Sequence, residues 1–334
     1  MFHSVSPLLY VSNRSTRVRN TLMDDLFSFI KQRKYDKFYD CFAGSAAASF
    51  FAMQNKIAKS YIINDLWEPL AMLWHYIKEA PETVKNNFEI LSQDLYKAYA
   101  LGNDYSFFNK IQYEFNNKTS SSEKAAMVLL LINYSEDGAP WLENGILQNT
   151  FSQNKDILEL KDFTKTLIQK TGIMLANNKV SFRAEDFAVS IKEATSDDFV
   201  FMDPPYPENL NAYNDNISTK AVYPKIHDKE NMHNIILDSI DILSQKKVSY
   251  LILYGLYQGS DYTFYLSKNS DTIHLLCLSG SLDLPDGLFL ENIYISKNIS
   301  LTNLPMGLFD SNIFTGMSKK AAIEFAFESM KKNI

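Results

Sequence analysis

The pattern of apolar and polar positions predicts helices and short buried strands in alternation at both ends of the chain. Toward the N-terminus, it predicts helices over residues 20–33, 46–54 and 68–78 and strands over 37–42 and 60–63. In the second half, it predicts strands over 180–183, 198–202 and 248–254 and a helix over 229–244. Strands and helices in this order are typical of a parallel α/β sheet.

The stretch between about Pro81 and Lys170 differs from both flanks. It is rich in helix-forming residues, contains long polar turns and has little strand character. Its longest apolar run, 125–132, is far shorter than the roughly 18 residues that a membrane span needs, and it predicts a buried core element. We therefore expect one α/β domain built from residues 1–80 and 171–334, with a helical insertion over residues 81–170.

Composition narrows the class of protein. With 46% hydrophobic and 22% charged residues, the chain has the balance of a soluble globular protein. Its two cysteines, Cys41 and Cys277, predict neither a disulfide framework nor a metal site. The first residues lack the pattern of a secretory signal, so we expect a cytoplasmic protein without a membrane partner. The net charge of −6 argues against strongly electrostatic binding of nucleic acid.

The strongest chemical signal is Asp203-Pro204-Pro205-Tyr206, which directly follows an apolar strand. An acid in this position lies where open α/β sheets bind ligands. Because prolines fix the backbone and lack N–H donors, the Asp203 carboxylate and the Pro204 carbonyl can both accept hydrogen bonds from one planar amine. Tyr206 can stack on its ring. This arrangement suits methylation of adenine's exocyclic nitrogen through positioning alone, although a rigid turn is the alternative interpretation.

Two earlier turns suit a nucleoside cofactor. The small residues of the segment 40–46, Asp-Cys-Phe-Ala-Gly-Ser-Ala, allow the backbone to approach a ligand closely. The segment lacks the three-glycine fingerprint of dinucleotide-binding proteins, which disfavours NAD. Asp65 ends the next predicted strand and can accept hydrogen bonds from ribose hydroxyls, cap the following helix, or do both.

Together these motifs resemble those of the Dam-type, alpha-class DNA adenine-N6 methyltransferases over about residues 7–260. The family's Asp-x-Phe-x-Gly turn matches Asp40, Phe42 and Gly44, and its Asn-Asp-x-x-x-Pro element matches Asn64, Asp65 and Pro69. Its catalytic tetrapeptide matches Asp203 to Tyr206. Its N-terminal Tyr-x-Gly-x-Lys motif and its Asp-Phe pair match Tyr10 to Arg14 and Asp186-Phe187. The stretch 130–149 resembles the segment beside the family's target-recognition insertion.

The resemblance implies a Rossmann-like, S-adenosylmethionine-dependent methyltransferase sheet with a helical target-recognition insertion. It further implies a site-specific enzyme that flips its target adenine out of double-stranded DNA, needs no metal, and has a cognate restriction enzyme as a potential partner. The cofactor-binding residues that it implies are Tyr10, Arg14, Asp40, Phe42, Ala43, Gly44, Ser45, Asp65, Asp186, Phe187 and Asp203. The catalytic residues are Asp203, Pro204, Pro205 and Tyr206, and the substrate-binding residues are Tyr206, Tyr213 and Asn133.

The segment expected to face DNA departs from the family's pattern. Residues 134–144 carry three acids and no base where the family usually has an arginine, and residues 294–300 lack its usual basic motif. In the N-terminal motif, Ser12 replaces a glycine and Arg14 replaces a lysine. These departures leave two alternatives open. One is methylation of RNA, of a protein amide or of a small-molecule amine, and the other is a catalytically silent DNA-binding subunit.

Overall fold

A computed structural model describes the α/β core and most of the helices between its two parts. The described residues are 6–8, 27, 30, 33–136, 138, 140, 142–143, 145–153, 156–204, 229–254, 271–279, 289–299, 308–310, 321, 325–326 and 329. The predicted helix over 20–33 falls almost wholly outside this set, but Phe27 and Ile30 are helical and buried. No helix within these ranges is both long and apolar enough to cross a membrane.

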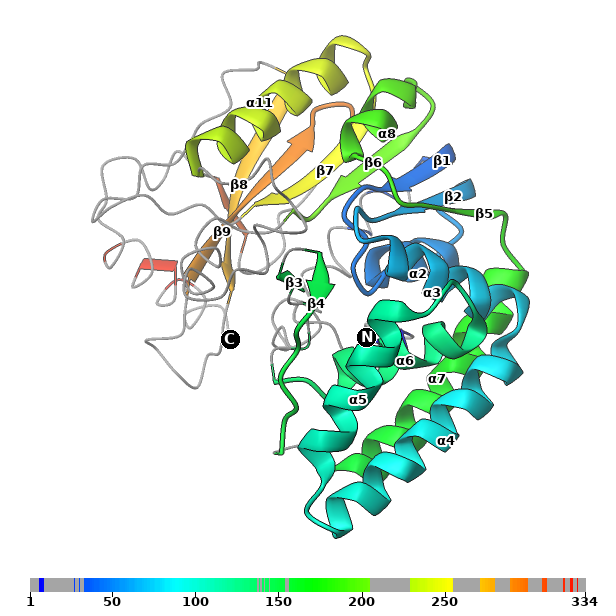
Figure 1. The fold of residues 1–334 in the computed structure, drawn as a ribbon. Coiled ribbons are helices and arrows are strands. Elements are labelled where there is room, and N and C mark those ends of the chain that lie inside the picture. The colour runs from blue at the N-terminus through cyan, green and yellow to red at the C-terminus, as the bar shows by residue number, and fades with distance from the viewer. Residues whose placement is uncertain are drawn as a thin grey trace.

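An eight-stranded sheet forms the centre of the described structure, in the order β10-β8-β9-β7-β6-β1-β2-β5 (Figure 1). The strands are β1 (Tyr35–Asp40), β2 (Ala58–Asn64), β5 (Val180–Arg183), β6 (Phe199–Met202), β7 (Ser249–Tyr254), β8 (Thr272–Ser279), β9 (Phe289–Ser296) and β10 (Leu308–Asp310). The neighbouring strands β7, β6, β1, β2 and β5 run parallel to one another. Strand β9 is antiparallel to β7 and β8, and β10 is antiparallel to β8. The predicted α/β class is confirmed.

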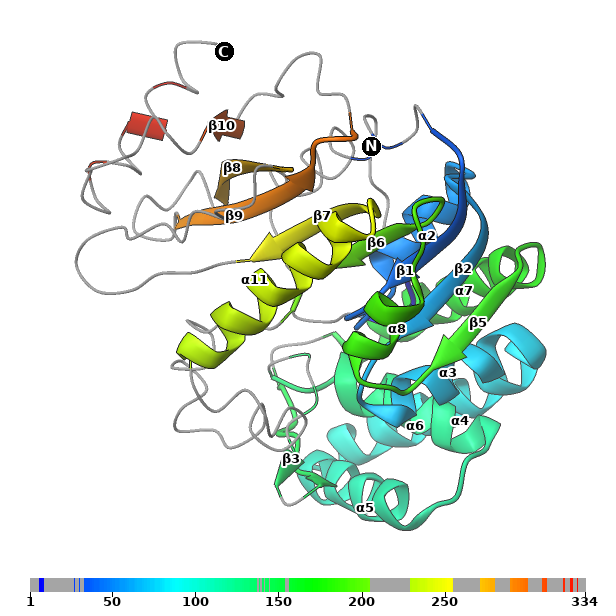
Figure 2. The same cartoon turned by 90° about the horizontal axis from the view of Figure 1, so that it is seen from above.

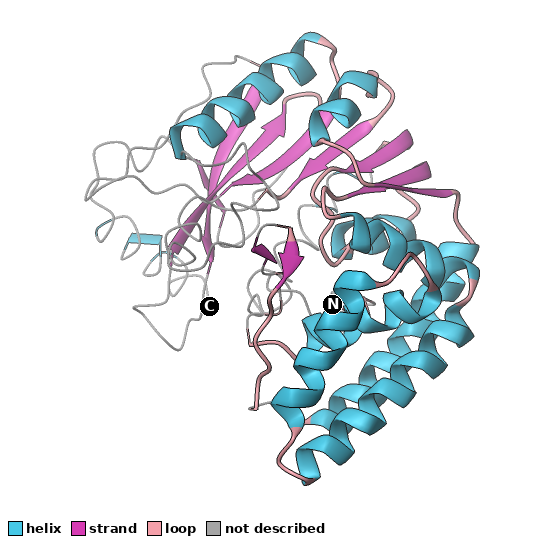
Figure 3. Cartoon of the chain, viewed as in Figure 1, coloured by secondary structure: helices cyan, strands magenta, loops and turns pink. Residues whose placement is uncertain are grey.

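Helices cover both faces of this sheet. The helices in the described ranges are α2 (Ala47–Gln54), α3 (Glu68–Glu79), α4 (Pro81–Ala100), α5 (Asp104–Asn117), α6 (Ser122–Asn133), α7 (Ile157–Ala176), α8 (Phe187–Glu193) and α11 (Lys229–Gln245). Helices α8 and α11 lie on one face, and α2 and α3 lie on the other, as Figure 2 shows from above. Helices α4 to α7 continue outward from the side of α3 (Figure 3).

Strand alternation divides the core into two layers. Phe38, Phe199 and Phe201 pack with α2 and α3, whereas Tyr39 and Val200 pack with α8 and α11. The first layer is one apolar cluster that extends into α4 to α7. The predicted core element at 125–132 is confirmed, because every residue of this run is buried in α6.

The helical region packs tightly against α3. A Cβ atom on Gly172 of α7 would lie 2.9 Å from the Ile77 carbonyl oxygen of α3 and 2.7 Å from the Cβ atom of Pro81, at the start of α4, so glycine permits this close approach. Helix α7 crosses the predicted boundary at residue 170 and ends at Ala176. The division of the chain into a catalytic and a target-recognition domain stays a prediction.

A small hairpin, β3 (Leu142–Glu143) with β4 (Ile146–Leu147), follows α6. Gly145 in its turn has a φ of 80°, a left-handed conformation that favours glycine. The Asn116 amide of α5 donates to the Leu147 carbonyl at 3.1 Å and accepts from the Leu147 N–H at 3.0 Å. These two bonds fix the hairpin to the helices.

Candidate active site

Acidic residues lie together at the carboxyl edge of the parallel strands. In the sheet register Asp40 is opposite Phe201 on β6 and opposite Ile63 on β2. Asp203 and Asp65 each lie two residues beyond those partners, just past the ends of β6 and β2, and the charges of both act on Asp40. Asp40 and Asp65 are buried, and Asp203 is partly exposed. This edge includes the point between β1 and β6 where the order of the strands reverses, which is where open α/β sheets bind ligands.

Asp40 is held by the helix that follows it. Its Oδ2 atom accepts a 2.7 Å hydrogen bond from the Ser49 hydroxyl and a 3.2 Å bond from the Ser49 N–H. Its Oδ1 atom is buried and has no hydrogen-bond partner among the residues that the structure describes. A buried acceptor without a partner fits a ligand that brings a donor or a positive charge. The sequence prediction missed Ser49, although it is a lone hydroxyl in the middle of a helix of small and apolar residues.

Asp65 fixes the turn that follows β1. Its Oδ2 atom accepts from the Gly44 N–H at 2.9 Å, and its Oδ1 atom accepts from the Trp67 N–H at 3.0 Å. Gly44 and Ala46 both have left-handed backbones, with φ values of 49° and 56°, so the turn is sharp. Helix α3 begins at Glu68 with Trp67 as its N-cap residue, and Asp65 therefore stabilises the turn just before the helix.

Asp186 and Phe187 lie beside the same turn. Asp186 is the N-cap residue of α8, and its Oδ1 atom accepts from the Ala188 N–H at 2.9 Å. The ring of Phe187 lies against the ring of Phe42, with 4.8 Å between their centroids. The structure therefore brings the predicted residues of the β1 turn together with those at the start of α8.

Other predicted residues lie elsewhere. Asn133, at the end of α6, is fully buried, and its amide donates to the Pro7 carbonyl at 2.9 Å and to the Thr164 hydroxyl at 3.2 Å. It is thus enclosed by protein groups and connects the segment 6–8 to the helices. Pro204 is buried next to Asp203. The predicted residues outside the described set are Tyr10, Arg14, Pro205, Tyr206 and Tyr213.

Burial changes the acidity of the two enclosed carboxyl groups. It raises the pKa of Asp40 to about 7; the bonds from Ser49 oppose this shift, and the nearby charges of Asp203 and Asp65 add to it. Burial likewise raises the pKa of Asp65 to about 6, against the two backbone bonds from Trp67 and Gly44. A cationic ligand beside these carboxylates would favour their charged forms.

We predict that these shifts make the ligand-free protein less stable as the pH rises from about 4 to about 7. The folded chain binds the Asp40 proton more tightly than the unfolded chain, whose pKa is about 3.9. Between the two pKa values the folded state holds more protons, so the free energy of unfolding falls with increasing pH. Urea unfolding should show that wild type loses stability relative to the Asp40→Asn variant between pH 5 and pH 8. A difference between the two that is independent of pH would contradict this prediction.

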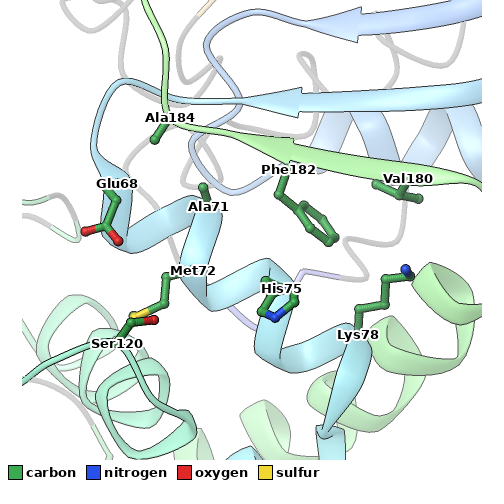
Figure 4. Close-up of a pocket in the computed structure, with 9 residues that line it drawn as sticks. All are labelled: Glu68, Ala71, Met72, His75, Lys78, Ser120, Val180, Phe182 and Ala184. Carbon is green, nitrogen blue, oxygen red and sulfur yellow. The ribbon is translucent and has the colours of Figure 1, made fainter.

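A separate open pocket lies between α3 and the edge strand β5 (Figure 4). It has a volume of about 430 Å³ and is lined by Glu68, Ala71, Met72, His75, Lys78, Ser120, Val180, Phe182 and Ala184. None of the predicted site residues lines this pocket. In the ranges that the structure covers, no three His, Cys, Asp or Glu residues are grouped so as to hold a metal ion.

The fold and the site define a class. The chain has a doubly wound sheet, a small-residue turn after its first strand, an acid after its second strand and another acid at the switch point. This combination is typical of proteins that bind a nucleoside cofactor. Within this class, the chain belongs to the family of D12 class N6 adenine-specific DNA methyltransferases, whose model matches residues 19–273. The predicted family is confirmed, and methyltransferases of this kind take their methyl group from S-adenosylmethionine.

Two named relatives are similar to parts of the chain. The type II methyltransferase M1.LlaDCHI of Lactococcus lactis subsp. cremoris is 24% identical over 188 residues, which are 53% of this chain and 59% of that protein. The type II methyltransferase M.MjaIII of Methanocaldococcus jannaschii is 22% identical over 213 residues, 60% of this chain and 69% of that protein. The match therefore spans about three fifths of the first relative and somewhat more of the second.

Proposed function

We propose that this chain transfers a methyl group from S-adenosylmethionine to the exocyclic N6 atom of an adenine in double-stranded DNA. The observation that carries this proposal is the carboxyl-edge cluster of Asp40, Asp65 and Asp203, next to the Phe42–Phe187 ring pair. Membership in the adenine-N6 family supports the reaction type. The proposal also includes site-specific activity, a cognate restriction enzyme as partner and a cytoplasmic location.

The acidic cluster suits the methionyl end of the cofactor. That end carries an ammonium and a sulfonium group besides its own carboxylate, and the Oδ1 atom of Asp40 offers the ammonium an acceptor in a buried, negatively charged setting. The backbone from Ala43 to Ser45 would approach the cofactor closely, and Asp65 would accept from a ribose hydroxyl with its remaining lone pairs. Asp186 and Phe187 would hold the adenine ring. Tyr10 and Arg14 would complete the site. When bound, the cofactor supplies an electrophilic methyl group.

The catalytic tetrapeptide would position the target base. The Asp203 carboxylate and the Pro204 carbonyl would each accept one hydrogen of the N6 amine, which directs the nitrogen lone pair toward the methyl donor. Tyr206, with Tyr213 nearby, would stack on the flipped base, and Pro205 would fix the turn. Methyl transfer would form the N6–carbon bond as the methyl–sulfur bond of the donor breaks, and the donor would leave as a neutral thioether. The proton that the nitrogen then releases would pass to the Asp203 carboxylate and on to water.

The acidic segment 134–144, which lacks the arginine usual in the family, motivates a second candidate, a substrate other than duplex DNA: RNA, a protein amide or a small-molecule amine. To decide between the two, we would incubate the full chain with S-adenosylmethionine carrying a labelled methyl group and with matched duplex DNA or RNA. The expected product is N6-methyladenine in DNA. Label in RNA alone would establish the second candidate. Binding of the cofactor without transfer to any nucleic acid or amine would contradict both and leave the silent DNA-binding subunit.

A further inference from the structure

A single buried amide connects the three turns of the candidate site. Asn64, the last residue of β2, is 1% exposed. Its Nδ2 atom donates to the Cys41 carbonyl at 3.2 Å and to the Glu185 carbonyl at 3.0 Å. Its Oδ1 atom accepts from the Glu185 N–H at 3.1 Å. The partners are 23 and 121 residues away in sequence, so this side chain joins distant parts of the chain.

The chemistry of this position requires an amide. Two carbonyl oxygens face one side of the Asn64 side chain and an N–H group faces the other, which fixes the orientation of the amide. An aspartate has the same shape, but its ionised carboxylate has no hydrogen to donate and would place negative charge against two carbonyl oxygens. A serine can satisfy only part of the set, because it has one donor and a shorter side chain.

The three segments that Asn64 joins carry most of the candidate cofactor residues. Cys41 lies between Asp40 and Phe42, Glu185 directly precedes Asp186, and Asn64 itself directly precedes Asp65. Backbone bonds strengthen the same connection: the Ala43 N–H donates to the Asn64 carbonyl at 2.9 Å, and the Asp65 N–H donates to the Arg183 carbonyl at 3.2 Å.

We propose that Asn64 is a positioning residue for the cofactor site, a role that rests on the proposed function. It sets the spacing between the β1 turn and the start of α8, and thus the gap in which Asp40, Asp65 and Asp186 meet one ligand. Since its side chain is enclosed, it acts through these neighbours and does not touch the cofactor. Loss of the amide lets the two loops move apart, and cofactor affinity falls even where the fold survives.

The test is direct binding of S-adenosylmethionine to the full chain by calorimetry. Asn64→Asp should weaken binding at least about tenfold, because it loses two buried donors, and Asn64→Ser should weaken it less. Asn149→Ala is the matched control. Asn149 is also a buried asparagine, and it donates to the Leu131 carbonyl at 3.3 Å within the helical region. We expect it to lower the melting temperature but to keep cofactor affinity within about twofold of wild type.

Steady-state kinetics provide a second readout. The Asn64→Ser variant should raise the KM for S-adenosylmethionine while the KM for DNA and the rate at saturating cofactor stay close to wild type. Wild-type affinity in both Asn64 variants would overturn the inference, and so would an equal loss of affinity in Asn149→Ala. If wild type itself fails to bind the cofactor, the proposed function is wrong, and the inference falls with it.

Discussion

Replacing Asp203 with alanine should lower the rate of methyl transfer to adenine by about two to three orders of magnitude. In the proposed mechanism, the variant removes one of the two acceptors for the N6 hydrogens and also the carboxylate that would take up the released proton. The loss should appear in the rate constant at saturating DNA and cofactor, because the missing contacts are those that strengthen as the nitrogen is alkylated. A single-turnover assay with labelled S-adenosylmethionine measures this constant.

Asp198→Ala is the control for the Asp203 experiment. Asp198 precedes the other end of strand β6, is buried, and accepts from the Lys37 N–H at 3.0 Å and the Thr195 N–H at 2.9 Å. Its loss should destabilise the same strand without changing the chemistry, so the rate per folded molecule should remain within about threefold of wild type. If Asp203→Ala is as active as Asp198→Ala, Asp203 has no catalytic role.

The parallel half of the fold was predictable because short strand-forming segments alternate with helical patterns along the chain. The errors lie at the boundaries. The strand predicted over 37–42 is β1, Tyr35–Asp40, because the chain turns at Cys41 and Phe42 even though both are buried. Because the apolar residues continue into this turn, the hydrophobic pattern does not mark where the strand ends.

The antiparallel strands β8, β9 and β10 were not predicted. Strand β9 lies between β7 and β8, although it follows both in sequence. A local pattern carries no information about such an insertion, because the pairing depends on contacts between distant segments. The hairpin β3–β4 was also missed, although Asn144-Gly145 is a strong signal for a tight hairpin turn.

The same limit applies to the site. The acids at strand ends could be predicted from sequence, because the carboxyl ends of parallel strands meet at one edge. The roles of the residues that hold these acids and their turns in place could not be predicted. Ser49 and Asn64 are ordinary polar residues, and the packing of α2 and β5 sets their hydrogen-bond partners. Asn133 bonds to Pro7, which is 126 residues away in sequence, and a local pattern carries no sign of this contact. The predicted role of Asn133 in substrate binding stays a prediction.

We expect Asp65→Ala to lower both cofactor affinity and stability. The variant would leave the Gly44 and Trp67 N–H groups without their carboxylate partner at a buried turn, at a cost of about 1–3 kcal/mol for each unsatisfied group. Without this anchor, the left-handed residues Gly44 and Ala46 lose the contact that holds the turn against β2. Calorimetry should show at least about tenfold weaker binding of S-adenosylmethionine, together with a lower melting temperature.

Asp156→Ala separates these two effects. Asp156 caps α7 with the same chemistry, since its Oδ1 atom accepts from the Leu158 N–H at 3.0 Å and the Glu159 N–H at 2.9 Å. Its removal should cost about 1 kcal/mol of stability, the usual value for a lost N-cap. Because Asp156 lies in the helical region, cofactor affinity should be unchanged. Equal losses of affinity in the two variants would show that Asp65 acts only through general stability, and unchanged affinity in Asp65→Ala would remove it from the cofactor site.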